Sequence, residues 1–157
     1  MSDTERIARG LIERTLPKVA LTHEAHLRAG LWHVLHFGPV AALGLLRVRI
    51  GAYNESVGTQ NTDTSGYHET ITRFYVLVID RFLSAVDCTL PIDQLATRLI
   101  AECGDPRLPL RYYSEEHLFS VAARRSWVEP DRVQFETGCS ARYGASRTDH
   151  EERGSSL

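Results

Sequence analysis

The chain has 157 residues, of which 43% are hydrophobic and 24% charged, and its formal net charge is −2 at pH 7. This length and composition are typical of one globular domain with a single apolar core. The slightly negative charge argues against a nucleic-acid-binding face, which requires a basic surface. Uninterrupted apolar stretches fall short of the about 18 residues that a spanning helix requires, so we expect no membrane segment.

The cysteines and the first residues of the chain bear on its compartment. Cys88, Cys103 and Cys139 are odd in number, widely spaced and form no CxxC pair. They therefore indicate neither a disulfide framework nor a thiolate metal site. The first residues are charged and lack the apolar core of a signal peptide. We expect a cytoplasmic protein.

Apolar residues recur at helical spacing through most of the chain, and strand-like alternation is rare. A first helix is expected over residues 3–16, capped by Asp3 or Thr4 and ending before Pro17. Thr22 is a suitable cap for a second helix, which runs to about His36 and stops at Gly38-Pro39. A third helix is expected over residues 40–58.

The polar stretch TQNTDTSG, residues 59–66, separates this third helix from the next. Further helices are expected from Gly66 to about Val86, capped by Ser65 or Thr64; from Pro91 to Cys103; and from Ser114 to just before Pro130. Residues 137–157 are Gly- and Ser-rich and aperiodic, which predicts a disordered tail behind a helical domain of residues 1–136. The fold class is therefore expected to be all-α, a single-domain bundle of five or six helices.

Four histidines and a glutamate lie in LTHEAHLRAGLWHVLH, residues 21–36. At about 100° per residue, His23 lies at the edge of the apolar stripe and Glu24 projects into it. A buried carboxylate is costly unless it is paired, so Glu24 is expected either to serve a site or to pair with Arg28 or Arg49. The other histidines, His26, His33 and His36, fall on the flank or on the solvent side.

A second polar group begins the fourth helix, in GYHETIT, residues 66–72. His68 falls within a wide apolar face and Glu69 at its border, in the first turn of the helix, where free backbone N–H groups favour anions. We expect these side chains and those of the second helix to face one interior pocket. The alternative for His68 is a buried histidine bonded to a backbone carbonyl.

Three chemistries are compatible with this pocket. Zinc, iron or manganese would be held by the ligands His23, His26, His68 and Glu69. A metal-free general acid–base site would use His23, Glu24 and His68, with the carboxylate fixing a histidine tautomer. In the third case the cluster binds a polar ligand by hydrogen bonds alone. The spacing matches neither the HExxH motif of zinc proteases nor the ExxH motif of di-iron bundles.

The polar connection before the fourth helix offers further ligand contacts. Small hydrogen-bonding residues can fold over a pocket and donate side-chain and backbone groups to it. The candidates for cofactor or ligand binding are Tyr53, Asn54, Asn61 and Thr64, and the alternative is a solvated linker. Tyr112, Tyr113, Arg124 and Trp127 offer walls for a pocket, although aromatic residues at helical spacing usually pack in a core.

Three segments in one order resemble an uncharacterised family of small helical bacterial proteins: LTHEAHLRAGLWHVL, YNESVGTQNTDTSGYHETITRFY and YYSEEHLFSVAARRSWVEPD. The shared pattern covers residues 10–131. The resemblance implies a single helical unit and no particular activity.

We therefore expect a cytoplasmic helical protein whose interior His/Glu pocket binds a divalent metal or a polar small molecule, with metal-dependent catalysis as one form of this function. The alternative is a non-catalytic ligand-sensing or protein-interaction module with a buried polar network. The expected partner is a small molecule, with neither nucleic acid nor membrane involved. An apolar helix face would permit a homodimer.

Overall fold

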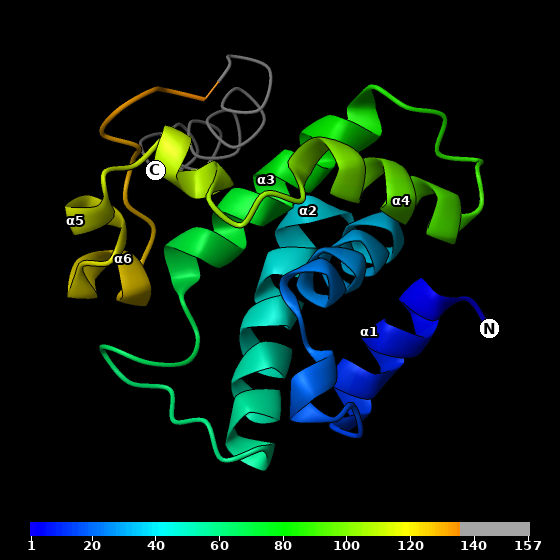
Figure 1. Ribbon diagram of the computed structural model, residues 1–157, viewed down its shortest axis with the longest axis horizontal. Coiled ribbons are helices and arrows are strands. Elements are labelled where there is room, and N and C mark those ends of the chain that lie inside the picture. Colours follow the sequence, from blue (N-terminus) through cyan, green and yellow to red (C-terminus); the bar gives the residue numbers. More distant parts are fainter. Residues whose placement is uncertain (136–157) are drawn as a thin grey trace, which may run out of the picture.

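The computed structural model describes residues 1–135, and the tail expected over residues 137–157 lies outside them. Within the described range the chain forms helices and no strand, which confirms the all-α class. The α-helices are α1 (Asp3–Glu13), α2 (His23–Ser56), α3 (Glu69–Ser84), α4 (Ile92–Cys103), α5 (Glu115–Leu118) and α6 (Val121–Arg125), and the 3-10 helices are η1 (Lys18–Ala20) and η2 (Leu108–Arg111) (Figure 1).

Several helix boundaries differ from the expected ones because other side chains cap the helices. Ser2 caps α1 in place of Asp3 or Thr4, whereas Thr22 caps α2 as expected. The helix expected from Ser114 to Pro130 is instead divided into α5 and α6. The division lies at Ser120, whose side chain accepts the backbone N–H of Ala123 and begins a new helix.

The N-terminus of α1 is held by a carboxylate from α4. Asp93 accepts the backbone N–H groups of Asp3 and Thr4 at 3.0 and 2.9 Å. Arg28 of α2 donates to the hydroxyl of the fully buried Thr4 at 2.9 Å. Three helices therefore meet at one point, and the first free N–H groups of α1 are satisfied from a distant part of the chain.

α2 reverses direction near its middle. Gly38 has φ 76° and ψ 166°, which no helix contains, and Pro39 follows it. A straight helix would separate residues 33 and 49 by about 24 Å. Arg49 nevertheless donates to the Nε2 atom of His33 at 2.9 Å. The first arm, residues 23–37, and the second arm, residues 39–56, therefore lie side by side, and the expected interruption at Gly38-Pro39 is confirmed.

By length and composition, α2 is the one helix of the described residues that is apolar enough to cross a membrane. The core helix of a soluble protein has the same properties, and α2 supplies much of the core through Leu27, Leu31 and Leu46. The turn at Gly38 leaves arms of 15 and 18 residues. The absence of a membrane segment therefore stays a prediction.

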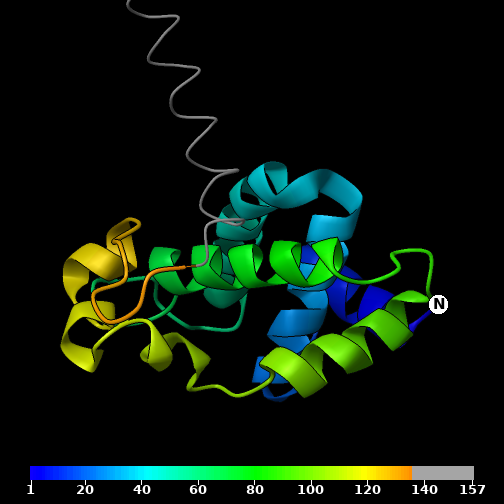
Figure 2. The ribbon, with the colours of Figure 1, turned by 90° about the horizontal axis from the view of Figure 1, so that it is seen from above.

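Two apolar clusters meet on α3. The larger one joins α1 to α4 and includes Leu11, Leu31, Ile79 and Leu99. The smaller one contains Phe74, Tyr113 and Leu118, with Trp127 and Phe135 packed against it. Residues 108–135 contribute most of this second cluster, and we call them the C-terminal segment. Figure 2 shows its helices α5 and α6 beside the first turns of α3, with α4 toward the other end.

The conformation of Gly38 generates a prediction with a matched control. An alanine Cβ at Gly38 would contact nothing within 4 Å, so the cost of Gly38→Ala comes from the backbone alone. We expect this variant to lower the free energy of unfolding by about 1–3 kcal/mol. Gly44 also has open space around it but is helical, so Gly44→Ala is expected to stabilise by up to about 1 kcal/mol. Urea unfolding of both variants measures the difference, and equal effects would contradict the strained turn.

Candidate functional site

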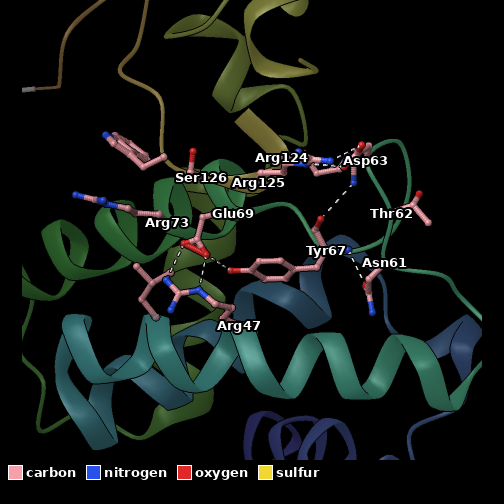
Figure 3. A pocket seen from close by; sticks show the side chains of 12 residues that line it. Arg47, Asn61, Thr62, Asp63, Tyr67, Glu69, Arg73, Arg124, Arg125 and Ser126 are labelled. Atoms are coloured by element: carbon pink, nitrogen blue, oxygen red, sulfur yellow. Dashed lines mark hydrogen bonds and ion pairs between the residues drawn. The ribbon is translucent and has the colours of Figure 1, made fainter. Parts of the chain in front are cut away.

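A hollow of about 670 Å³ lies between the second arm of α2, the start of α3, the loop before it, and α6 with the residues that follow (Figure 3). We call it the arginine pocket. Its charged lining consists of Arg47, Arg73, Arg124, Arg125, Asp63 and Glu69. Its other walls include Leu43, Asn61, Thr62, Tyr67, Ser126 and Trp127.

Glu69 forms the most buried ion pair of this pocket. Arg47 donates to both of its carboxylate oxygens, at 2.7 and 2.9 Å, and the Tyr67 hydroxyl donates to one of them at 2.8 Å (Figure 3). Burial acts to raise the pKa of Glu69, but the bonds from Arg47 and Tyr67 outweigh it and hold the pKa below its usual value. The carboxylate is therefore ionised and accepts three hydrogen bonds.

A second ion pair and a backbone contact fix the loop side of the pocket. Arg125 donates to both oxygens of Asp63 at 2.7 Å. Arg124 donates to the carbonyl oxygen of Gly66 at 2.9 Å. Both arginines belong to α6, so the C-terminal segment holds the polar loop in place beside α3.

The aromatic wall of the pocket also carries a cation. The guanidinium of Arg73 lies over the Trp127 ring, 4.6 Å from its centroid, in a cation–π contact. Of the residues that the structure describes, four arginines and two carboxylates line the hollow. The excess of two positive charges makes it suited to an anionic ligand, because guanidinium groups match phosphate and carboxylate geometry.

His68 is placed as a structural residue and not as a ligand. It is the cap of α3: its Nδ1 accepts the backbone N–H of Ile71 at 3.1 Å. Its Nε2 lies 2.8 Å from the carbonyl oxygen of Leu118, which can only accept, so Nε2 carries the proton. Both ring nitrogens are therefore occupied, as in the alternative of a carbonyl-bonded histidine.

The other two expected catalytic residues, His23 and Glu24, differ in their exposure to solvent. His23 lines a cavity of about 240 Å³ between the arms of α2 and α3. Glu24 is exposed, contrary to its projection into the apolar stripe. The reason is its place in the first turn of α2, where the neighbouring positions Ala25 and Leu27 meet the core instead. Neither of its expected partners forms an ion pair with Glu24, because Arg28 contacts Asp93 and Arg49 contacts His33.

The four expected metal ligands are not assembled around one point. His26 is exposed and its Nδ1 bonds the carbonyl oxygen of Thr22, Glu69 is engaged by Arg47, and both nitrogens of His68 are occupied. Residues 1–135 contain no group of three His, Cys, Asp or Glu side chains that could hold a metal ion. The two histidine-bearing helices do converge, however. His26 and Thr72 line both the 240 Å³ cavity and an adjoining hollow that includes His68.

His33, expected on the flank of its helix, is fully buried. Its Nδ1 donates to the carbonyl oxygen of Ala29 at 2.7 Å, and its Nε2 accepts from Arg49 at 2.9 Å. Burial, together with the positive charge of Arg49, lowers the pKa of His33 to about 4. The neutral ring therefore joins the two arms of α2. His36 is exposed, as expected.

The loop residues expected to bind a ligand have mixed roles. Tyr53 is buried and donates to the carbonyl oxygen of Leu16 at 2.9 Å, so it is a packing residue. Asn61 lines the arginine pocket, but its side chain also bonds Asn54, the Tyr67 N–H and the Gly51 carbonyl, which organises the loop. Asn54 lines the hollow beside His68, whereas Thr64 is exposed and lies on none of the three hollows described here.

Arg124 and Trp127, two of the expected pocket walls, line the arginine pocket, whereas Arg47, Arg73 and Arg125 line it without having been expected from the sequence. A signal was present: Arg47 and Arg73 interrupt otherwise apolar helical stretches, LLRVRI and TITRFYV. A cation on a largely apolar helix needs a partner or a ligand. Their spacing in the sequence does not predict that these arginines line one pocket, because they lie on different helices.

The buried His33 predicts a pH dependence of stability. Above pH 6.5 the ring is neutral in the folded and the unfolded chain; between pH 6.5 and 4 only the unfolded chain takes up the proton. The free energy of unfolding therefore falls as the pH falls, by about 3 kcal/mol in total from this group. His33→Gln is expected to flatten this part of the profile in urea unfolding from pH 7 to 4. His36→Gln, on the exposed side of the same arm, is expected to leave the slope unchanged; equal slopes in all three proteins would contradict the assignment.

The two arginine–carboxylate pairs predict unequal stability effects. The Glu69 side chain is 9% exposed and that of Asp63 is 48% exposed. Arg47→Met removes the main partner of a buried carboxylate and is expected to lower the free energy of unfolding by about 1–3 kcal/mol. Arg125→Met is expected to cause no measurable loss, because exposed pairs contribute little. Thermal and urea unfolding compare the two variants, and an equal loss in both would contradict the predicted difference between the buried and the exposed pair.

No protein-family model, curated protein or solved structure matches the chain. The resemblance to small helical bacterial proteins therefore remains an expectation.

Proposed function

We propose that this protein binds a small anionic molecule, a phosphate ester or a polycarboxylate, in the arginine pocket. The single observation that carries this proposal is the charge of the lining within residues 1–135, four arginines against two carboxylates. The ligand is still a polar small molecule, as expected from the sequence, but the residues proposed to bind it are those of the arginine pocket. A divalent metal is not part of the proposal.

The internal ion pairs leave donors for such a ligand. A guanidinium carries five N–H groups in a planar fork. The bonds to Glu69 and Asp63 each engage the Nε and Nη2 atoms of one arginine, Arg47 and Arg125. Both arginine side chains are more than half exposed, so their remaining N–H groups are open to an incoming anion. The carboxylates thus hold the guanidinium planes in fixed orientations, which lowers the entropy cost of binding.

Neutral groups around the arginines favour a ligand with further polar atoms. Thr62, Ser126 and Asn61 offer hydroxyl and amide groups at the rim, and the Trp127 ring forms one wall. A simple halide would use only the charge. A phosphorylated or polycarboxylated molecule would also use these hydrogen-bonding groups, and its size fits a hollow of about 670 Å³.

Calorimetric titration with inorganic pyrophosphate at constant ionic strength tests this proposal. We expect binding to the wild-type protein that weakens as the salt concentration rises, because the attraction is between exposed charges. Arg125→Gln removes one positive charge and is expected to weaken binding about fivefold. Asp63→Asn removes a competing carboxylate and is expected to tighten binding by a similar factor.

The matched control is Arg98→Gln, which removes an exposed arginine from α4, away from the pocket. It is expected to bind pyrophosphate as the wild type does. Absence of pyrophosphate binding would overturn the proposal. So would equal weakening by Arg98→Gln and Arg125→Gln, since that would reduce the effect to the net charge of the protein.

A further inference from the structure

A second cavity, separate from the arginine pocket, lies between the two arms of α2 and the middle of α3. Its volume is about 240 Å³, and it shares no lining residue with the arginine pocket. Its walls are mainly aliphatic: Leu27, Leu46, Ile50, Ile71, Val76 and Ile79. We call it the apolar cavity.

The apolar walls favour an organic occupant over water. A cavity of about 150 Å³ with such a lining stays dry and takes up benzene. The apolar cavity is larger than that, and a glycine helps to form it. A Cβ at Gly30 would lie 2.8 Å from the Cδ1 atom of Ile79, so even a methyl group there would press on the opposite wall.

Two polar atoms beside this lining have no partner within the described residues. They are Nε2 of His23 and the hydroxyl of Tyr75, both buried, on rings whose centroids are 5.3 Å apart. Both residues line the apolar cavity. Buried polar groups in native proteins are nearly always hydrogen-bonded, so two neighbouring exceptions at one cavity indicate a missing partner.

The protonation states of these groups determine the charge of that partner. Burial lowers the pKa of His23 and raises the pKa of Tyr75, so both side chains are neutral at pH 7. Within residues 1–135, no arginine or lysine lines the cavity. An anion would therefore enter without a counter-charge, which is unfavourable among aliphatic walls.

We propose that the apolar cavity binds a neutral, mainly apolar small molecule of about ten non-hydrogen atoms, with one hydroxyl or carbonyl group directed to His23 and Tyr75. Its apolar part fills the space between the arms of α2 and α3. Its polar group completes the hydrogen bonding of the two buried side chains. This ligand differs in charge and in place from the anion proposed for the arginine pocket.

Two probes of nearly equal shape test the proposal, 2-phenylethanol and ethylbenzene, which differ by one hydroxyl group. Binding is measured from chemical-shift changes of the backbone amides of α2 and α3 in the full chain. We expect 2-phenylethanol to bind about fivefold more tightly than ethylbenzene, the effect of one added hydrogen bond. Equal affinity of the two probes, or no binding of 2-phenylethanol, would overturn the proposal.

Variants of the cavity wall locate the binding. Val76→Phe fills the cavity and is expected to abolish binding of both probes, whereas Val48→Phe, at a position 69% exposed on the second arm, is expected to bind as the wild type does. Gly30→Ala narrows the cavity against the flexible end of the Ile79 side chain and is expected to weaken the binding of both probes. This variant keeps the test available even if Val76→Phe does not fold. Wild-type binding in either cavity variant would place the probes elsewhere and contradict the inference.

The two polar atoms are tested together in His23→Leu/Tyr75→Phe. Removing both unpartnered groups is expected to leave the melting temperature unchanged or raised, because no hydrogen bond of these two atoms within residues 1–135 is lost. The preference for 2-phenylethanol over ethylbenzene is expected to fall to about one. A preference that persists in this double variant would show that the hydroxyl group does not contact His23 or Tyr75.

Discussion

The reversal of α2 at Gly38 is the constraint on which the rest of the structure depends. It brings two apolar helical arms together and turns one long element into two sides of the core. The second arm then presents adjacent stripes at i, i+4 spacing to different neighbours. Leu43 and Arg47 line the arginine pocket, whereas Leu46 and Ile50 line the apolar cavity. Both hollows therefore require the same turn.

Much of the fold follows from local rules. The helical period, the Thr22 cap, the Gly38-Pro39 interruption and the helix after Pro91 are all properties of neighbouring residues, and the structure contains each of them. The polar stretch before α3 was also predictable. Where local rules failed, a competing cap acted: Ser2 in place of Asp3, and Ser120 inside a segment expected to be one helix. Such choices among nearby capping residues depend on where the chain is held by distant contacts.

The candidate site was less accessible to sequence reasoning, because its groups come from distant parts of the chain. Periodicity located His23 and His68 on converging helices. The carbonyl oxygen that accepts the hydrogen bond from His68 belongs to Leu118, however, which lies 50 residues further along the sequence. The same holds for Glu69, whose partner Arg47 belongs to another helix. A helical projection also treats every turn alike, so it placed Glu24 in the core, whereas in the first turn of α2 the structure buries Ala25 and leaves Glu24 exposed. Pairing between elements is tertiary information.

The arginine pocket is composite, since its α2 and α3 walls belong to the main bundle while Arg124, Arg125 and Trp127 come from the C-terminal segment. That segment is attached through contacts of its own, including the bond from Thr70 to the Ser126 carbonyl and the Phe74 cluster. Local opening of the segment would remove two of the four arginines from the pocket while the bundle stayed folded. Ligand binding in the pocket and packing of the C-terminal segment on the bundle are thus thermodynamically linked. A ligand bound there therefore also stabilises the attachment of the C-terminal segment to the bundle.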